Sequence, residues 1–301
     1  MVNLTSISIT LDSQKELDAF SNYVNTRLAE LELCLGDILT EVQFVVISDL
    51  NRFPLRKLTL EHFSSIPSTQ VSKLRDLETL DLEQFEVGGI LEGFRDCTKM
   101  RMLTLHPNSS FCMKLSEDID VISGFTNLEE LEIVGPVSVD PSQINLLIPI
   151  MGNLSSLSLF LDGFPPDGFV KLLDALSSEK VRTVEFEFDM FPIELMRSLS
   201  KLHFLDRLRV EVRGEVVLSD EWLLAAFPPE SMLHLTSLVL DASNRHAHGT
   251  ISKDTMEKVL VGKRDLFHMY LRLPFSFPFI AIRRDFANAG ADVHVYDSRR
   301  S

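Results

Sequence analysis

Closely spaced pairs of acidic residues are the feature of this sequence that could do chemistry. Four such pairs have members two residues apart: Glu30 and Glu32, Asp81 and Glu83, Glu130 and Glu132, and Glu185 and Glu187. Residues two apart on a β-strand point to the same face, so each pair would place both charges together. General acid–base catalysis needs one such carboxyl to be desolvated, whereas docking of a basic partner needs only exposed charge. Whether the pairs serve catalysis or docking therefore depends on how far the elements that carry them bury their side chains.

Other reactive side chains fit no catalytic pattern. The sequence contains no glycine-rich phosphate loop, nucleophile elbow, HExxH or DxDxDG motif. His246 and His248 could approach a metal from RHAHG, but a third ligand is missing, so we interpret this segment as a solvated loop. A catalytic Cys34 would need a basic neighbour, and Glu30 and Glu32 would instead raise its pKa. We therefore predict no catalytic residue, no cofactor and no metal site.

A recurring leucine motif predicts the strands that position the acidic pairs. In LETLDL, residues 77–82, leucine occupies positions 1, 4 and 6; a strand would place positions 4 and 6 on one face and position 5 on the other. With other aliphatic residues allowed, the motif recurs at intervals of 22 to 31 residues, with a mean of 26. It begins at Leu4, Leu28, Leu55, Leu77, Met100, Leu128, Leu154, Val181, Leu205, Leu235, Leu266 and, in degenerate form, Gly290.

Segments between the motifs have helical patterns. Apolar residues recur at helical spacing in residues 13–28, 165–180, 192–202, 219–227 and 252–263. One strand and one helix in each repeat form a unit that cannot bury its own apolar face, so the repeats must stack. We therefore predict an α/β solenoid with parallel strands on the concave face and helices on the convex face. It would form a single domain of about 11–12 irregular repeats over residues 1–301.

Composition excludes several classes of function. The chain has 301 residues, 45% of them hydrophobic, and a net charge of -15, which disfavours binding to nucleic acids or anionic membranes. Three cysteines without a CxxC pair indicate reduced thiols rather than a disulfide framework or structural zinc. The sequence shows no secretory signal and no apolar run near the ~20 residues of a membrane span. We expect a cytoplasmic or nuclear protein.

The motif and its period resemble those of the leucine-rich-repeat superfamily, and the roughly 26-residue period is similar to that of the repeat region of F-box proteins. FPP turns at Phe164 and Phe227 and the low fidelity of the repeats are similar to fungal members of that class. The asparagine or cysteine typical of the position three residues after the last motif leucine is present at Asn108. It is replaced by Phe63, Phe85, Pro136, Asp162 and Asp189, so we expect irregular loops. We find no F-box motif.

Charge along the predicted concave face indicates a docking surface. Over repeats one to eight, positions 3, 5 and 7 hold nine acidic residues and one lysine. The later repeats balance their charges and add arginine and aromatic side chains, which are enriched at interface hot spots. Phe160 fits the same role, or instead packs on a neighbouring strand. We predict that partner contacts involve Asp81, Glu83, Glu130, Glu132, Phe160, Glu185, Glu187, Arg207, Arg209, Tyr270 and Arg272.

These observations predict a non-catalytic protein-recognition module whose partner has a basic surface. The F-box resemblance implies substrate recognition for a ubiquitin ligase, with the ligase adaptor bound through a module upstream of the repeats. The alternative is a stand-alone leucine-rich-repeat adaptor or a fragment of an immune-type receptor. An enzyme has no supporting motif, because an open sheet face would leave its carboxylates hydrated.

Overall fold

A computed structural model describes residues 5–10, 16, 28–34, 54–62, 74–86, 88–161, 166–188, 193–214, 216–241, 247–261, 265–266, 268–273 and 292–297. The chain divides into two compact units, residues 1–153 and 154–301, each described by itself. No described helix is both long enough and apolar enough to cross a membrane.

The first unit is built on parallel strands that pair in the order of the sequence. The strands lie side by side in their sequence order, and the paired residues occupy equivalent positions of successive motifs, except at Phe85 and Pro107, where the register shifts. Rows of equivalent side chains therefore run across the sheet. The strands are β1 (Ser6–Thr10), β2 (Glu30–Cys34), β3 (Lys57–Glu61), β4 (Thr79–Phe85), β5 (Met102–Pro107) and β7 (Glu130–Gly135).

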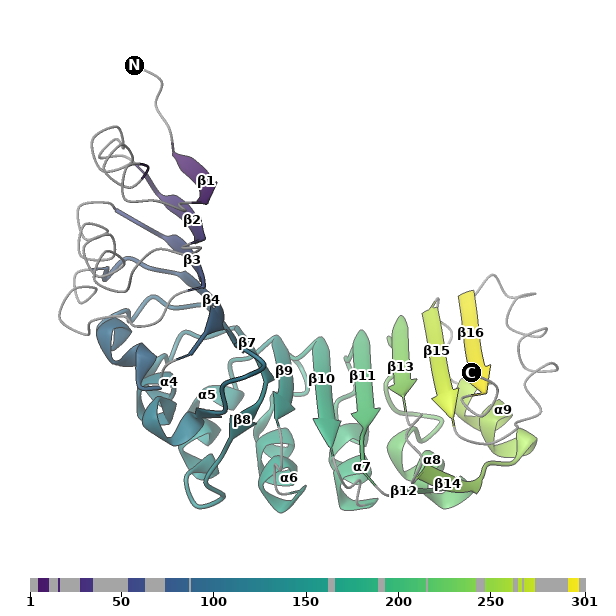
Figure 1. Cartoon of the computed structure of the whole chain (residues 1–301). Coiled ribbons are helices and arrows are strands. Elements are labelled where there is room, and N and C mark those ends of the chain that lie inside the picture. Colours follow the sequence, from purple (N-terminus) through teal and green to yellow (C-terminus); the bar gives the residue numbers. More distant parts are fainter. Residues whose placement is uncertain are drawn as a thin grey trace. The chain divides into compact units, whose positions relative to one another are not determined.

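The second unit repeats this arrangement (Figure 1). Its strands are also parallel, and their pairing again joins equivalent motif positions, so that Thr183 lies opposite Ser156 on one side and Arg207 on the other. The strands are β9 (Ser156–Leu161), β10 (Thr183–Phe188), β11 (Arg207–Val212), β13 (Ser237–Asp241), β15 (His268–Leu273) and β16 (Asp292–Asp297).

The leucine motif sets the start of every one of these strands, as the sequence predicted. Each motif begins two residues before a strand, from Leu4 ahead of β1 to Gly290 ahead of β16. The backbone shows the same period: the carbonyl of Arg56 accepts the amides of both Glu78 and Thr79, and the carbonyl of Glu78 accepts the equivalent pair in the next repeat. The predicted α/β leucine-rich-repeat solenoid is confirmed.

Helices of the second unit follow one side of its strands and cover the apolar motif positions (Figure 1). The Phe186 ring, at motif position 6, lies 5.3 Å from the Phe169 ring of the neighbouring helix, measured between centroids. Four of the five predicted helices are confirmed, and the fifth, at residues 13–28, lies largely outside the described residues. The four are α6 (Pro166–Ala175), α7 (Ile193–Ser200), α8 (Asp220–Ala226) and α9 (Lys253–Val261).

Described helical elements of the first unit are short, at three to six residues each. Side chains of Asn127 and Asn153, one residue before their motifs, donate to carbonyls of the preceding repeat. Phe85 occupies the usual asparagine position and is fully buried, so the core takes up this side chain. The helical elements are η2 (Ile90–Phe94), η3 (Leu115–Glu117), α4 (Ile119–Gly124), η4 (Ile144–Leu147) and α5 (Ile148–Met151).

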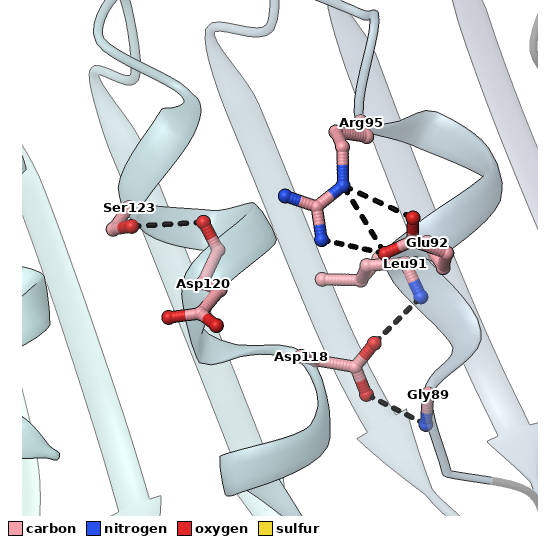
Figure 2. Close-up of polar contacts among 7 residues, drawn as sticks. All are labelled: Gly89, Leu91, Glu92, Arg95, Asp118, Asp120 and Ser123. Carbon is pink, nitrogen blue, oxygen red and sulfur yellow. Dashed lines mark hydrogen bonds and ion pairs between the residues drawn. The ribbon is translucent and has the colours of Figure 1, made fainter.

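A buried carboxylate from one repeat caps a helix of the repeat before it (Figure 2). Asp118 is fully buried; its Oδ1 accepts the Leu91 amide at 2.7 Å and its Oδ2 accepts the Gly89 amide at 3.1 Å. These are the otherwise unpaired amides at the start of η2. Gly89 has a φ of 66°, a left-handed conformation that glycine adopts without strain. The cap therefore joins two successive repeats.

Two small parallel pairs of strands were not predicted. They are β6 (Met113–Lys114) with β8 (Val137–Ser138), and β12 (Val216–Ser219) with β14 (Ala247–Thr250). Strand β14 contains residues 247–249 of RHAHG. Our interpretation of that segment as a loop is therefore wrong, because its backbone forms a strand. Pairing with a strand some 30 residues earlier provides the backbone hydrogen bonds that a local pattern does not reveal.

Candidate functional site

The face of each sheet opposite the apolar positions carries motif positions 3, 5 and 7, and we call it the strand face. In the first unit, register places Glu32, Thr59, Asp81, Thr104 and Glu132 in one row. A second row contains Cys34, Glu61, Glu83 and His106. Charges from residues 22 to 28 apart in the chain thus lie on adjacent strands.

Apolar positions on the opposite side of the sheet are buried as predicted. Leu80, Leu82 and Ile133 have no exposed surface and Leu131 is 1% exposed, whereas Glu130 is exposed. The assignment of motif positions 4 and 6 to the core and of Glu130 to the strand face is therefore confirmed.

Four titratable side chains form a cluster on the strand face of the first unit. Glu83 and His106 lie directly opposite each other on β4 and β5. His106 Nε2 lies 3.1 Å from Glu132 Oε1 on β7, and Asp81 is in electrostatic contact with Glu83, His106 and Glu132. We call Asp81, Glu83, His106 and Glu132 the acidic–histidine cluster. The sequence motifs did not point to His106, although it occupies motif position 7 of its repeat.

Burial changes the chemistry of Asp81. Its Oδ1 is buried and accepts no hydrogen bond from the described residues. Burial raises the pKa of Asp81 to about 6, and the negative charge of Glu83 adds to this rise, while His106 opposes it. We expected an open sheet face to leave its carboxylates hydrated, and Asp81 departs from that expectation: it lies between Thr59 and Thr104, which are themselves buried.

His106 on β5 and Glu132 on β7 share a hydrogen bond, and their pKa values are shifted in opposite directions. The hydrogen bond to Glu132 raises the pKa of His106, and the charges of Glu132, Glu83 and Asp81 reinforce this, whereas burial opposes it. The same hydrogen bond lowers the pKa of Glu132. The cluster can therefore bind a proton near neutral pH, and its net charge becomes more negative as pH rises.

Glu187 in the second unit does not present a free charge. We predicted that it points into solvent, but it is 6% exposed and forms an ion pair with Arg213. In register it lies between Phe160 and Glu211 on the neighbouring strands. The prediction of an exposed docking charge is wrong for Glu187, while Glu185 on the same strand remains half-buried.

Arginine and aromatic side chains do meet on the strand face of the second unit. Arg209 donates to Glu211 Oε1 from Nε at 2.9 Å, and its guanidinium lies 5.5 Å from the centre of the Phe160 ring. Phe160 thus packs under an arginine from two strands away, in a cation–π contact. The predicted packing of Phe160 on a neighbouring strand is therefore observed. The ring also stays half exposed, which leaves the predicted partner contact possible.

A hollow of about 400 Å³ lies beside these residues. Arg207, Arg209 and Glu185 supply its charges, and His268 lies at its edge on β15. Thr236 and Ser237 also line it. Tyr270 lies half-buried on the same strand as His268, and the side chain of Arg272 lies outside the described residues. The hollow can accept a polar side chain or terminus from a partner.

Three solved structures share this architecture at low sequence identity. An internalin (inlF) from Listeria monocytogenes aligns with 98% of this chain and 83% of its own, with a TM-score of 0.50 and 14% identity. The receptor kinase HAESA from Arabidopsis, solved with the peptide hormone IDA and the co-receptor SERK1, aligns over 89% of this chain with a TM-score of 0.50 and 17% identity. A second HAESA structure, of the ectodomain with an N-terminally extended IDA peptide, gives the same TM-score at 16% identity.

This chain has the leucine-rich-repeat fold. It spans less than half the length of the HAESA chains, at 43% and 42%, so the likeness concerns the repeat architecture. No protein-family model and no curated protein matches the sequence. On the strand face, motif positions 3, 5 and 7 of this chain hold the acidic–histidine cluster in the first unit and the arginines that line the hollow in the second.

Proposed function

We propose that this chain is a non-catalytic protein-recognition module whose strand face in the first unit docks a basic surface of a protein partner. The observation that carries this proposal is the register of carboxylates on that face. Seven acidic residues and one lysine occupy motif positions 3, 5 and 7 of the first unit. Such a field steers a cationic partner and accelerates association.

The arrangement favours recognition over catalysis. Asp81 has a raised pKa and a histidine nearby, two properties that general acid–base catalysis also uses. The neighbouring carboxylates, however, make the local electrostatic potential negative, which favours binding of cationic groups. The sequence contains none of the nucleophile, phosphate-binding or metal motifs of known enzymes. Protein binding needs only the charges and shapes that the strand face presents.

As the finer proposal, the module selects substrates for an F-box-type ubiquitin ligase in the cytoplasm or nucleus. The repeat period supports this, and a ligase adaptor would then copurify with the full-length protein through a module upstream of the repeats. A stand-alone adaptor or an immune-type receptor fragment is the alternative. Both HAESA structures contain a peptide hormone, which is a property of that receptor. Recovery of a nucleotide-binding or kinase domain in the same polypeptide would favour the receptor.

Binding kinetics of the partner that copurifies with this chain test the docking face. The face variant replaces the exposed residues Glu30, Glu32 and Glu130 with glutamine. Its matched control replaces three other exposed carboxylates, Glu179, Glu194 and Glu230, and so removes equal charge elsewhere.

The face variant should associate several-fold more slowly than the control at low salt. This difference should shrink between 0.1 M and 1 M salt, as the Debye length falls from ~10 Å to ~3 Å. Equal association rates for the face variant and the control, with unchanged circular dichroism, would refute docking on this face.

A further inference from the structure

A cysteine, a glutamate and a histidine converge at one end of strands β2 and β3. The potential ligand atoms of Cys34, Glu61 and His62 all lie within 4.8 Å of one another. Cys34 is the last residue of β2, and Glu61, the last residue of β3, lies directly opposite it. We propose that these three side chains bind a zinc ion, with water completing a four-coordinate site.

The backbone explains how consecutive residues reach the same ion. Neighbouring residues of a regular strand point to opposite faces, so Glu61 and His62 would normally diverge. His62 has a φ of 56°, which breaks this alternation, and Gln84 at the equivalent position of the next repeat has a φ of 55°. The same backbone conformation thus occurs in two successive repeats, and in the first of them it is adopted by a histidine, which can bind a metal. Histidine tolerates this region better than most residues.

The identity of the ligands selects the metal. A thiolate, an imidazole and a carboxylate are the side chains that bind Zn²⁺, at about 2.0–2.3 Å. Three protein ligands with an open fourth position is the pattern of zinc sites that are accessible to solvent. Magnesium and calcium prefer oxygen ligands alone, so the sulfur of Cys34 disfavours both. Ligands within 4.8 Å need to close by only about 1 Å to meet at tetrahedral distances.

The surroundings favour a cation and leave room for it. Cys34 and Glu61 are half-buried and His62 is exposed, so an ion can enter from solvent. Glu83 lies opposite Glu61 on the next strand and adds negative charge. On binding, the thiol of Cys34 loses its proton to the buffer and its sulfur becomes the metal ligand. The ion would then join β2 to β3 through side chains, in addition to their backbone hydrogen bonds.

Cobalt titration of the full chain tests this proposal directly. The protein is freed of metal with a chelator under reducing conditions and titrated with Co²⁺. One equivalent should produce a sulfur-to-cobalt charge-transfer band in the near ultraviolet, together with the visible bands of four-coordinate cobalt. Zn²⁺ should remove both, and excess Mg²⁺ or Ca²⁺ should not.

Matched variants separate this site from other thiols and carboxylates. Cys34→Ser should abolish the charge-transfer band, whereas Cys112→Ser, at an exposed cysteine elsewhere in the unit, should retain it. Glu61→Gln and His62→Asn should weaken cobalt binding roughly tenfold or more. Asparagine at position 62 keeps the left-handed backbone accessible, so that this variant tests the ligand alone. Glu83→Gln should retain the band.

Thiol protection in the unmodified protein gives a second measurement that no folding defect can affect. Stoichiometric zinc should slow alkylation of Cys34 while Cys112 continues to react at its original rate. Cys97 serves as an internal reference, because burial raises its pKa to about 12 and keeps it unreactive. The absence of a charge-transfer band, a band that survives Cys34→Ser, or equal protection of Cys34 and Cys112 would each overturn the proposal.

Discussion

His106 Nε2 lies 3.1 Å from Glu132 Oε1, and this contact connects strands whose residues are 26 positions apart in the chain. The hydrogen bond raises the pKa of His106 and lowers that of Glu132. The proton affinity of this pair therefore depends on folding, since the two residues come together only when β5 and β7 pair.

Replacing Glu132 with glutamine should therefore lower the pKa of His106. In the intact protein, NMR titration of the His106 ring should give a pKa above the usual 6.5, and Glu132→Gln should return it toward that value. Glu130→Gln is the control, because Glu130 lies on the same strand and does not bond to the ring. The stability that His106 contributes is full below pH 6.5 and is lost as pH rises through its folded pKa. An unchanged pKa in Glu132→Gln would contradict the assignment.

Asp81→Asn should stabilise the protein at neutral pH and not in acid. Folding raises the pKa of Asp81 from 3.8 to about 6, so the folded state binds more protons than the unfolded state between these values. Stability therefore falls as pH rises through this window, and the cost is complete above it. Asparagine removes that cost, by about 1–2 kcal/mol at pH 7.5 after allowance for partial exposure. Denaturant unfolding at pH 7.5 and at pH 3.5 measures the difference. An equal effect at both values would exclude ionisation as its cause.

Leu131→Ala should destabilise the first unit by ~2–5 kcal/mol, because it deletes a buried side chain from motif position 4. Leu146→Ala removes the same atoms from a residue that is 38% exposed and should cost within about 0.5 kcal/mol. Urea unfolding of the two variants gives both values. Similar losses would show that motif position 4 does not define the core.

Asp118→Ala should cost about 1–3 kcal/mol, because it leaves the buried amide of Leu91 and the partly buried amide of Gly89 without their acceptor. Asp120→Ala provides the comparison, since Asp120 is an exposed carboxylate two residues away (Figure 2). Hydrogen exchange adds a local measurement: amide exchange at Leu91 should accelerate in Asp118→Ala only. Retained protection at Leu91 would show that the cap does not hold η2.

Arg209→Ala should accelerate dissociation of the protein partner more than it slows association. The guanidinium is held by Glu211 and Phe160, so it is positioned before binding and should act as a hot spot worth ~2 kcal/mol or more. Tyr270→Ala should act in the same direction. Surface-plasmon dissociation rates measure both, with Arg197→Ala on α7 as the control. An unchanged dissociation rate would exclude these residues from the interface.

The sequence alone determined the strands that begin at the leucine motif, the helices α6 to α9 and the side of the sheet on which the motif residues lie. Motif spacing suffices for this, because a strand alternates its side chains every residue and a stacked repeat returns its apolar positions after a similar length of chain. Leu80, Leu82 and Leu131 are buried where the motif places them. Glu130 is exposed for the same reason.

Only the tertiary structure decided which strand-face side chains are free, paired or buried. Glu187 is buried between strands that carry Phe160 and Glu211, Asp81 is partly removed from water, and His106 bonds to Glu132. Each partner lies on an adjacent strand some 20 to 30 residues away. Local pattern assigns a residue to a face, but the length and direction of side chains across neighbouring strands set its solvation and charge. The motif likewise does not predict the left-handed backbone at His62, whose ring lies beside Cys34 and Glu61.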